Sequence, residues 1–270
     1  MPSWHPHFDV WLLVGALAGG YTLAVRRLGP RIVHPVERAV TRRQVLAFAG
    51  GLAAILVASQ WPVHDLAEGY LYSVHMVQHM LLSLVAPPLL LVGTPDWLMR
   101  RVLGRPGIAV ARFLTRPLVG LAIFNAVIAA THIPAVVELS TTSEAFHFAA
   151  HAVLFGAALC MWSPVLNPLM ELPKLSYPAR MFYLFLQSLL PTVPASFLTF
   201  GQTVLYQAYA EGPHPWGISA LTDQRAAGLI MKLAGGLLLW SVIGWYFFKW
   251  FRTEEREGLD VLEWTKARAA

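Results

Sequence analysis

The chain contains two histidine pairs with the same spacing, His75 with His79 and His147 with His151. In a helix, a four-residue step places both imidazoles of a pair on one face, about one turn apart. Neutral imidazole is a ligand for Cu, Zn, Fe and Ni, and histidines can also serve as axial ligands of haem. The spacing therefore predicts a metal or haem site, with His132 as a fifth candidate ligand.

Methionines adjoin the first histidine pair. Met76 and Met80 directly follow its two members, about 100° further round a helix, and Met231 lies at a comparable depth in a later apolar stretch. Thioether sulfur adds a preference for Cu(I), whereas the alternative interpretation is ordinary packing in a helix bundle. These three methionines are auxiliary candidates behind the histidines.

The composition indicates that these residues lie in a membrane protein. Hydrophobic residues make up 56% of the 270 residues and charged residues 13%, whereas a soluble domain has about a quarter charged residues. Most of the chain must face lipid or the inside of a membrane bundle. This excludes soluble enzymes and nucleic-acid binders despite the net charge of +5, and the single cysteine, Cys160, excludes a disulfide scaffold.

Seven apolar stretches are long enough to cross a bilayer, which takes about 20 residues each. Their approximate bounds are 8–25, 44–61, 70–92, 117–137, 145–165, 178–200 and 226–251. We therefore expect an all-α, seven-helix membrane bundle that forms one domain over residues 1–270, with a short cytoplasmic tail at 252–270.

The basic residues predict the orientation, because cytoplasmic loops carry the excess of Lys and Arg. All 20 except Arg225 and Lys232 fall in the first, third and fifth loops and in the tail. This pattern places the N-terminus outside and the C-terminus in the cytoplasm. Every histidine except His34 then lies toward the outer side, so four or five imidazoles converge just below the outer membrane surface.

Several residues in the spans have two open interpretations. His132 is either a ligand or an interhelical hydrogen-bond donor. Lys232 either reaches the membrane surface or acts as a counter-charge in a polar cavity, paired with Asp223 or Glu138. Asp223 and Gln224 either line the site or cap the last helix.

Three further patterns constrain the chemistry and the backbone. Pro87 and Pro88 should free carbonyl groups in the third span that neighbouring helices must satisfy. The near absence of carboxylates from the spans disfavours proton-coupled transport. The four-residue step of about 6 Å leaves room for at most one haem.

Three segments, in the same order along the chain, resemble the CtaG-type cytochrome c oxidase assembly factors, bacterial multi-spanning proteins associated with caa-type oxidases. The segments are His75-Met-Val-Gln-His79-Met with Ala86-Pro-Pro and Gly93-Thr-Pro95, then His147-Phe-Ala-Ala-His151 with Trp162-Ser-Pro-Val-Leu-Asn-Pro168, then Trp216-Gly-Ile-Ser with Asp223-Gln224 and Met231. Lys232 departs from the pattern, because an aromatic residue is expected there. The resemblance implies a protein of the bacterial plasma membrane that helps haem–copper oxidase to mature.

The first functional hypothesis is therefore an assembly factor, not an enzyme, that binds copper as Cu(I) on the outer side and passes it to an oxidase subunit. The alternatives are a haem-b redox protein or quinone oxidoreductase that uses the same histidines, and a copper permease. We expect lipid and haem–copper oxidase subunits as partners and no nucleic acid. Homo-oligomer formation is left open.

Overall fold

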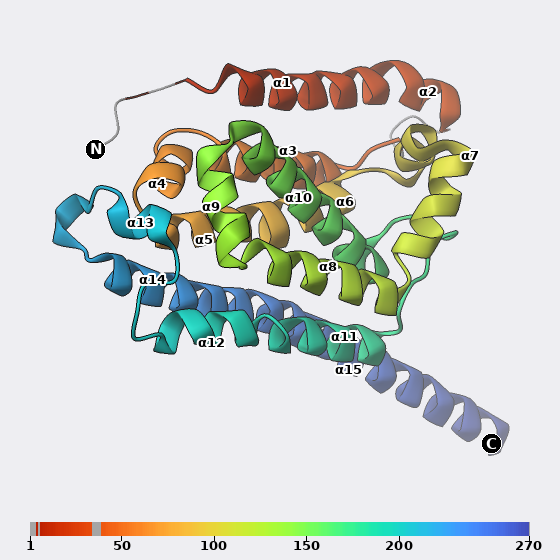
Figure 1. Ribbon diagram of the computed structural model, residues 1–270. Coiled ribbons are helices and arrows are strands. Elements are labelled where there is room, and N and C mark those ends of the chain that lie inside the picture. The colour runs from red at the N-terminus through yellow and green to blue at the C-terminus, as the bar shows by residue number, and fades with distance from the viewer. Residues whose placement is uncertain (1–3, 5, 34–38, 270) are drawn as a thin grey trace.

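The computed structural model describes residues 4, 6–33 and 39–269. Every regular element within those ranges is helical, as predicted (Figure 1). His5, His34 and Arg38, which entered the predicted topology, lie outside the described residues, as does residue 270 of the predicted tail.

Five helical stretches are long and apolar enough to cross a bilayer. The first consists of α1 (Phe8–Leu23), the π-helical turn η1 (Ala24–Leu28) and α2 (Gly29–Ile32), and the second of α5 (Tyr72–Met80), the π-helical turn η3 (Leu81–Val85) and α6 (Ala86–Gly93). The third is α10 (Glu144–Leu166), and the fourth consists of α11 (Tyr177–Leu189) and α12 (Thr192–Phe200). The fifth consists of α14 (Ala220–Leu229), the π-helical turn η5 (Ile230–Ala234) and α15 (Gly235–Ala269).

Two more pairs of helices are bent at a short break. α3 (Arg42–Ala58) and α4 (Val63–Gly69) meet at 42°, and α7 (Asp96–Leu114) and α8 (Pro117–Thr131) meet at 79°. The described chain thus has five spans, or up to seven if each bent pair crosses the membrane. The predicted seven spans correspond to the upper limit.

The structure differs from the predicted boundaries at the fourth span. This span was expected over 117–137, but α8 ends at Thr131 and a separate helix, α9 (Pro134–Thr142), begins at Pro134. Proline lacks a backbone N–H and disfavours helical geometry in the residue before it. The break therefore falls at His132 and Ile133, which places His132 at a helix end and not within a span.

Two segments expected as connections or tail are also helical. The arginine-rich third loop forms most of α7, interrupted at Gly104, whose φ of 62° and ψ of −179° are not helical. The last helix continues from the span through Ala269 and so includes most of the predicted tail. The short elements α13 (Gln207–Glu211) and η4 (Pro215–Gly217) connect α12 to α14.

α10 lies within the bundle and packs against α6 and α8, while α11 packs against α15 and α12 against α14. Leu154, Met161 and Trp162 of α10 are fully buried in the largest apolar cluster, together with Leu184 of α11 and Tyr246 of α15. α1 lies along the outside of these helices (Figure 1), and most of its apolar side chains are exposed. An exposed apolar helix suits a lipid environment.

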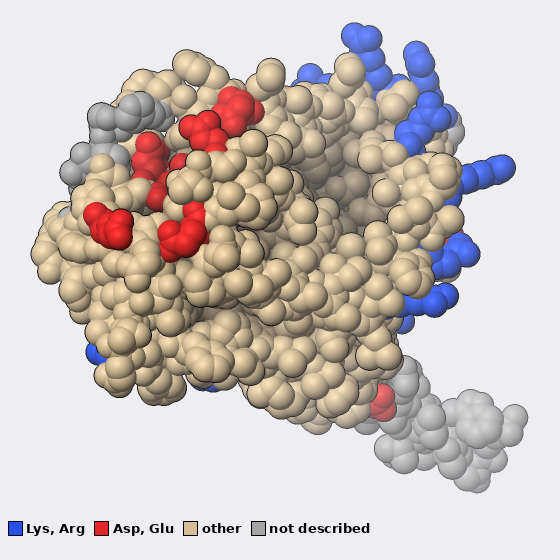
Figure 2. Space-filling model, viewed as in Figure 1, with Lys and Arg blue, Asp and Glu red and all other residues tan. Residues whose placement is uncertain are grey.

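Charged side chains separate to opposite ends of the molecule. Figure 2 shows Lys and Arg gathered at one end and a group of Asp and Glu at the other. The acidic end carries Asp65, Glu68, Glu138, Glu144 and Glu211, on α4, α9, α10 and α13. This separation agrees with the predicted topology, in which the acidic end faces outward; the side of the membrane stays a prediction.

Pro87 interrupts backbone hydrogen bonding after the first histidine pair, and a neighbouring helix compensates. Because proline has no N–H, the Ser83 carbonyl four residues earlier loses its helical donor. The indole Nε1 of Trp162 on α10 donates to this carbonyl oxygen at 3.0 Å, and Ser83 Oγ donates to the His79 carbonyl at 2.6 Å. The freed carbonyl thus links the helix of His75 and His79 to α10.

Close contact between α8 and α10 predicts a stability effect at Gly120. A Cβ atom added there would lie 2.9 Å from the Cys160 carbonyl oxygen, so Gly120→Ala should destabilise the chain by about 1–3 kcal/mol through overpacking. Gly156→Ala is the control on α10, because a Cβ there meets nothing within 4 Å. Thermal unfolding in detergent should show a lower midpoint only for Gly120→Ala; equal midpoints would contradict the close packing.

Candidate metal centre

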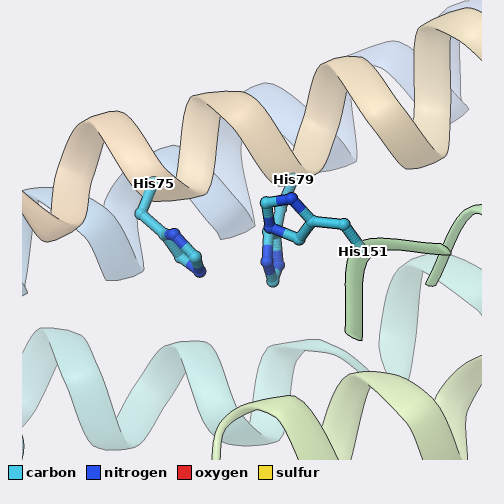
Figure 3. A group of neighbouring side chains, drawn as sticks. All are labelled: His75, His79 and His151. Atoms are coloured by element: carbon cyan, nitrogen blue, oxygen red, sulfur yellow. The ribbon is translucent and has the colours of Figure 1, made fainter. Parts of the chain in front are cut away.

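His75, His79 and His151 form the most compact group of histidines. One nitrogen atom from each lies within 4.8 Å of the other two. The ring centroids are 4.3 Å apart for His75 and His79, 5.2 Å for His79 and His151, and 5.7 Å for His75 and His151. Figure 3 shows the three rings together, two from α5 and one from α10. The two histidine pairs thus come close together in the structure, while their depth in a membrane stays a prediction.

The buried nitrogen atoms of these histidines lack hydrogen-bond partners. Among the described residues, nine buried side-chain nitrogen or oxygen atoms have no partner, and five of them belong to the five histidines predicted as ligands. These atoms are Nδ1 of His75 and His79, and Nε2 of His132, His147 and His151. Buried polar groups in proteins are nearly always paired, so the residues fit a metal ion that would use their lone pairs.

His147 lies between the compact group and a second group of candidate ligands. Its ring centroid is 4.2 Å from that of His151 and 6.0 Å from that of His75. Its Nε2 is also 3.1 Å from Glu68 Oε1, which in turn is 3.3 Å from His64 Nε2. His64, Glu68 and His147 place their ligand atoms within 4.8 Å of one another.

Sequence reasoning did not select His64 or Glu68 as site residues. The signal that could have found them is the four-residue step, since His64 and Glu68 repeat the spacing of the two histidine pairs. The step lies in α4, a short helix in the segment expected as an outer connection. In a connecting segment, the carboxylate of Glu68 reads as an ordinary loop charge.

Burial alters the acid–base properties of this second group. Burial raises the pKa of the Glu68 carboxyl to about 7, an effect that His7 partly opposes. The pKa of His64 is lowered to about 4, mainly by burial and also by the neighbouring His7 and His147. His64 is therefore neutral near pH 7, the protonation state in which imidazole binds metal.

His132 belongs neither to the compact group nor to the group of His64, Glu68 and His147. Its ring centroid is 6.3 Å from that of His79. Its Nδ1 lies 2.7 Å from the Ile128 carbonyl oxygen, which can only accept, so Nδ1 carries the proton. The free lone pair of the neutral ring is therefore on Nε2. The bond from His132 lies within its own helix, since Ile128 belongs to α8, and so it is not the interhelical bond considered from the sequence. Nε2 is buried without a partner, and its role as a ligand stays a prediction.

The three methionines line a cavity beside the compact group. This cavity, of about 60 Å³, is bordered by Met76, Met80 and Met231 and by His79 and His132. Met76 is fully buried, and Met80 and Met231 pack partly against the main apolar cluster. The thioethers thus serve in packing and also face the same space as two of the histidines.

Lys232 borders this cavity but does not pair with the acids considered for it. Its Nζ donates to Thr192 Oγ1 at 3.3 Å, and its side chain is exposed. Glu138 Oε1 instead accepts from the backbone N–H of Ala208 at 3.2 Å. The Asp223 carboxylate is likewise bonded to backbone N–H groups, so Lys232 is not a counter-charge to either acid.

Asp223 and Gln224 support the backbone around the site. Asp223 accepts hydrogen bonds from the N–H groups of Tyr72 at 2.6 Å and Ser73 at 3.1 Å, at the start of α5. It therefore caps the helix of His75 and His79, and not its own helix. Gln224 accepts from the Leu205 N–H and donates to the Thr203 carbonyl. Both residues position neighbouring segments through these bonds.

Comparison with known proteins finds one family across most of the chain. The family model described as "Cytochrome c oxidase caa3 assembly factor" matches residues 19–253. The uncharacterized proteins Mb0105 of Mycobacterium bovis and MT0111 of Mycobacterium tuberculosis are each similar at 29% identity, over 90% of this chain and 39% of their own length. The chain thus spans well under half the length of these relatives. No solved structure matches it.

The capping role of Asp223 predicts a loss of stability without a loss of metal ligands. Asp223→Asn should destabilise the chain by about 1–2 kcal/mol. A carboxylate accepts the two backbone hydrogen bonds with two charged oxygens, whereas an amide has one neutral acceptor oxygen. The metal stoichiometry of the folded variant should stay unchanged. Asp9→Asn, an exposed acid in the first turn of α1, is the control for thermal unfolding. An unchanged midpoint in Asp223→Asn, or a lost metal ion, would contradict the assignment.

Proposed function

This chain belongs to the cytochrome c oxidase caa3 assembly factor family, and from that membership we propose that it holds copper as Cu(I) at the histidine cluster and passes it to a haem–copper oxidase subunit. The observation that carries the proposal is the convergence of unpaired imidazole nitrogens from α5 and α10 at one end of the bundle. In this proposal copper is the cargo and not a resident cofactor.

The ligand set of His75, His79 and His151 favours a monovalent ion. All three ligands are neutral imidazoles, and no carboxylate joins them within the compact group. The electrostatic cost of burying an ion rises steeply with its charge, unless ligand charge compensates. A buried group of neutral ligands therefore suits Cu(I) better than a divalent ion.

The methionine-lined cavity supports release toward a client. His79 borders this cavity together with Met76, Met80 and Met231, and thioether sulfur is a preferred ligand of Cu(I). An ion held by His79 can exchange an imidazole for a thioether without an acid, a base or a nucleotide. We propose that this exchange begins the transfer to the oxidase, in the plane of the membrane.

The haem alternative fits the geometry less well. The two cavities that border the histidines have volumes of about 60 and 20 Å³. Pockets for small molecules and cofactors occupy roughly 300 Å³ or more. A haem would have to separate α5 from α10 and α8, whereas the nitrogens of the compact group already lie within 4.8 Å of one another and need only small side-chain movements to reach one copper ion. A Soret band in the purified protein would favour haem.

Copper titration tests the proposed site. The purified full chain should bind about one Cu(I) at the compact group, and the variant with His75→Ala, His79→Ala and His151→Ala should lose it. His214→Ala is the matched control, since His214 is exposed and belongs to neither histidine group. Circular dichroism establishes that the triple variant is folded. Undiminished Cu(I) binding by a folded triple variant would overturn the site assignment.

Oxidase maturation tests the proposed role in cells. A strain that lacks the gene for this chain should make haem–copper oxidase with reduced copper content and activity, and the unaltered gene should restore both. The triple histidine variant should fail to restore them, whereas His214→Ala should succeed. Full restoration by the triple variant, at equal protein level, would show that assembly does not depend on this site.

A further inference from the structure

We propose that His64, Glu68 and His147 form a second metal site that takes a divalent transition-metal ion, such as Zn(II) or Cu(II), next to the Cu(I) site of His75, His79 and His151. The inference deepens the proposed function and rests on it for the role of the second site. His147 then shares a site with His64 and Glu68 of α4, while His151, its neighbour one turn along α10, belongs to the Cu(I) site.

Geometry supports a separate site. The ligand atoms of His64, Glu68 and His147 lie within 4.8 Å of one another, as do those of the compact group, but no residue belongs to both sets. Glu68 Oε1 is 3.3 Å from His64 Nε2 and 3.1 Å from His147 Nε2. His147 Nε2 is buried and makes no hydrogen bond despite this contact. In the tautomer protonated at Nδ1, it offers its lone pair to an ion held between the three side chains.

The ligand chemistry differs between the two sites. Two imidazoles and one carboxylate are the ligand set of several catalytic zinc sites, and the carboxylate charge offsets one of the two charges of a divalent ion. The compact group has imidazoles alone, which suits a monovalent ion. The two neighbouring sites therefore select ions of different charge.

The second site lies closer to solvent than the first. The side chains of Glu68, His64 and His147 are 35%, 16% and 7% exposed. One small cavity, of about 20 Å³, is bordered by Glu68 and His147 and also by His75, His79 and His151. An ion that enters at the acidic end therefore meets Glu68 and His147 before it reaches the compact group, with room between them for little more than one ion.

Gln78 contacts one of the proposed ligands, His64, from behind. Its Nε2 lies 3.0 Å from His64 Nδ1 and donates to the Ala58 carbonyl at 2.9 Å, while its Oε1 is buried without a partner. A metal on His64 Nε2 requires the proton on Nδ1. A half-turn of the carboxamide would bring Oε1 to that proton, at the cost of the bond to Ala58. Metal binding must offset the loss of the bond to Ala58. Gln78 is therefore a positioning residue for His64.

Zn²⁺ is the probe for the second site, titrated into the purified full chain in competition with a chromophoric chelator. Glu68→Gln should weaken Zn²⁺ binding at least about tenfold and leave Cu(I) binding unchanged. The variant with His75→Ala, His79→Ala and His151→Ala should show the reverse. Glu144→Gln, a neighbouring exposed acid outside both groups, is the control, and His64→Ala is the second variant should Glu68→Gln not fold.

The outcomes separate the second site from the proposed function. Zn²⁺ binding that is unaffected by Glu68→Gln and His64→Ala overturns the second site, while the Cu(I) site stands or falls on its own titration. Loss of both ions in every variant would mean a single shared site and would also overturn the inference. Bound Zn²⁺ should also slow the loading of Cu(I) in the unaltered chain but not in Glu68→Gln. Equal loading rates with and without Zn²⁺ in the unaltered chain would show that the second site does not lie on the entry path.

Discussion

Five histidine nitrogens among the described residues are buried without hydrogen-bond partners, and burying a polar group in this way is costly. An unpaired buried polar group costs about 1–3 kcal/mol. A chain with so few polar residues in its helices gains no stability from this arrangement. In the proposed function, a copper ion bound at the cluster would convert these lone pairs into bonds.

Three features hold the histidines in this costly arrangement. Asp223 caps α5 by accepting two backbone hydrogen bonds at its start, so a helix far along the chain fixes the position of His75 and His79. Ser143 caps α10 through the N–H of Phe146, one residue before His147. The Trp162 indole bonds the Ser83 carbonyl that Pro87 leaves free. Each of these contacts stabilises one of the two helices or joins them, and none of them uses a histidine.

The sequence predicts the part of this arrangement that depends on periodicity. The spacing of His75 and His79 and of His147 and His151 requires only helical geometry, and the cost of polar groups in lipid directs both pairs inward. Contacts between distant segments were less accessible. Asp223 was expected to cap its own helix or line the site, because its partners, Tyr72 and Ser73, lie 151 and 150 residues away. The spacing of His64 and Glu68 could have marked them as a pair, but the contact of Glu68 with His147 on α10 arises from the fold.

Copper K-edge X-ray absorption of the Cu(I)-loaded protein reports the ligands of the ion themselves. If His75, His79 and His151 hold the ion, its first shell contains three nitrogen atoms at about 2.0 Å, the usual distance from imidazole to a first-row metal ion, with the multiple scattering typical of imidazole. A first shell of sulfur atoms would place the ion at the methionines instead. A shell without imidazole scattering would contradict the assignment of His75, His79 and His151 as the copper ligands.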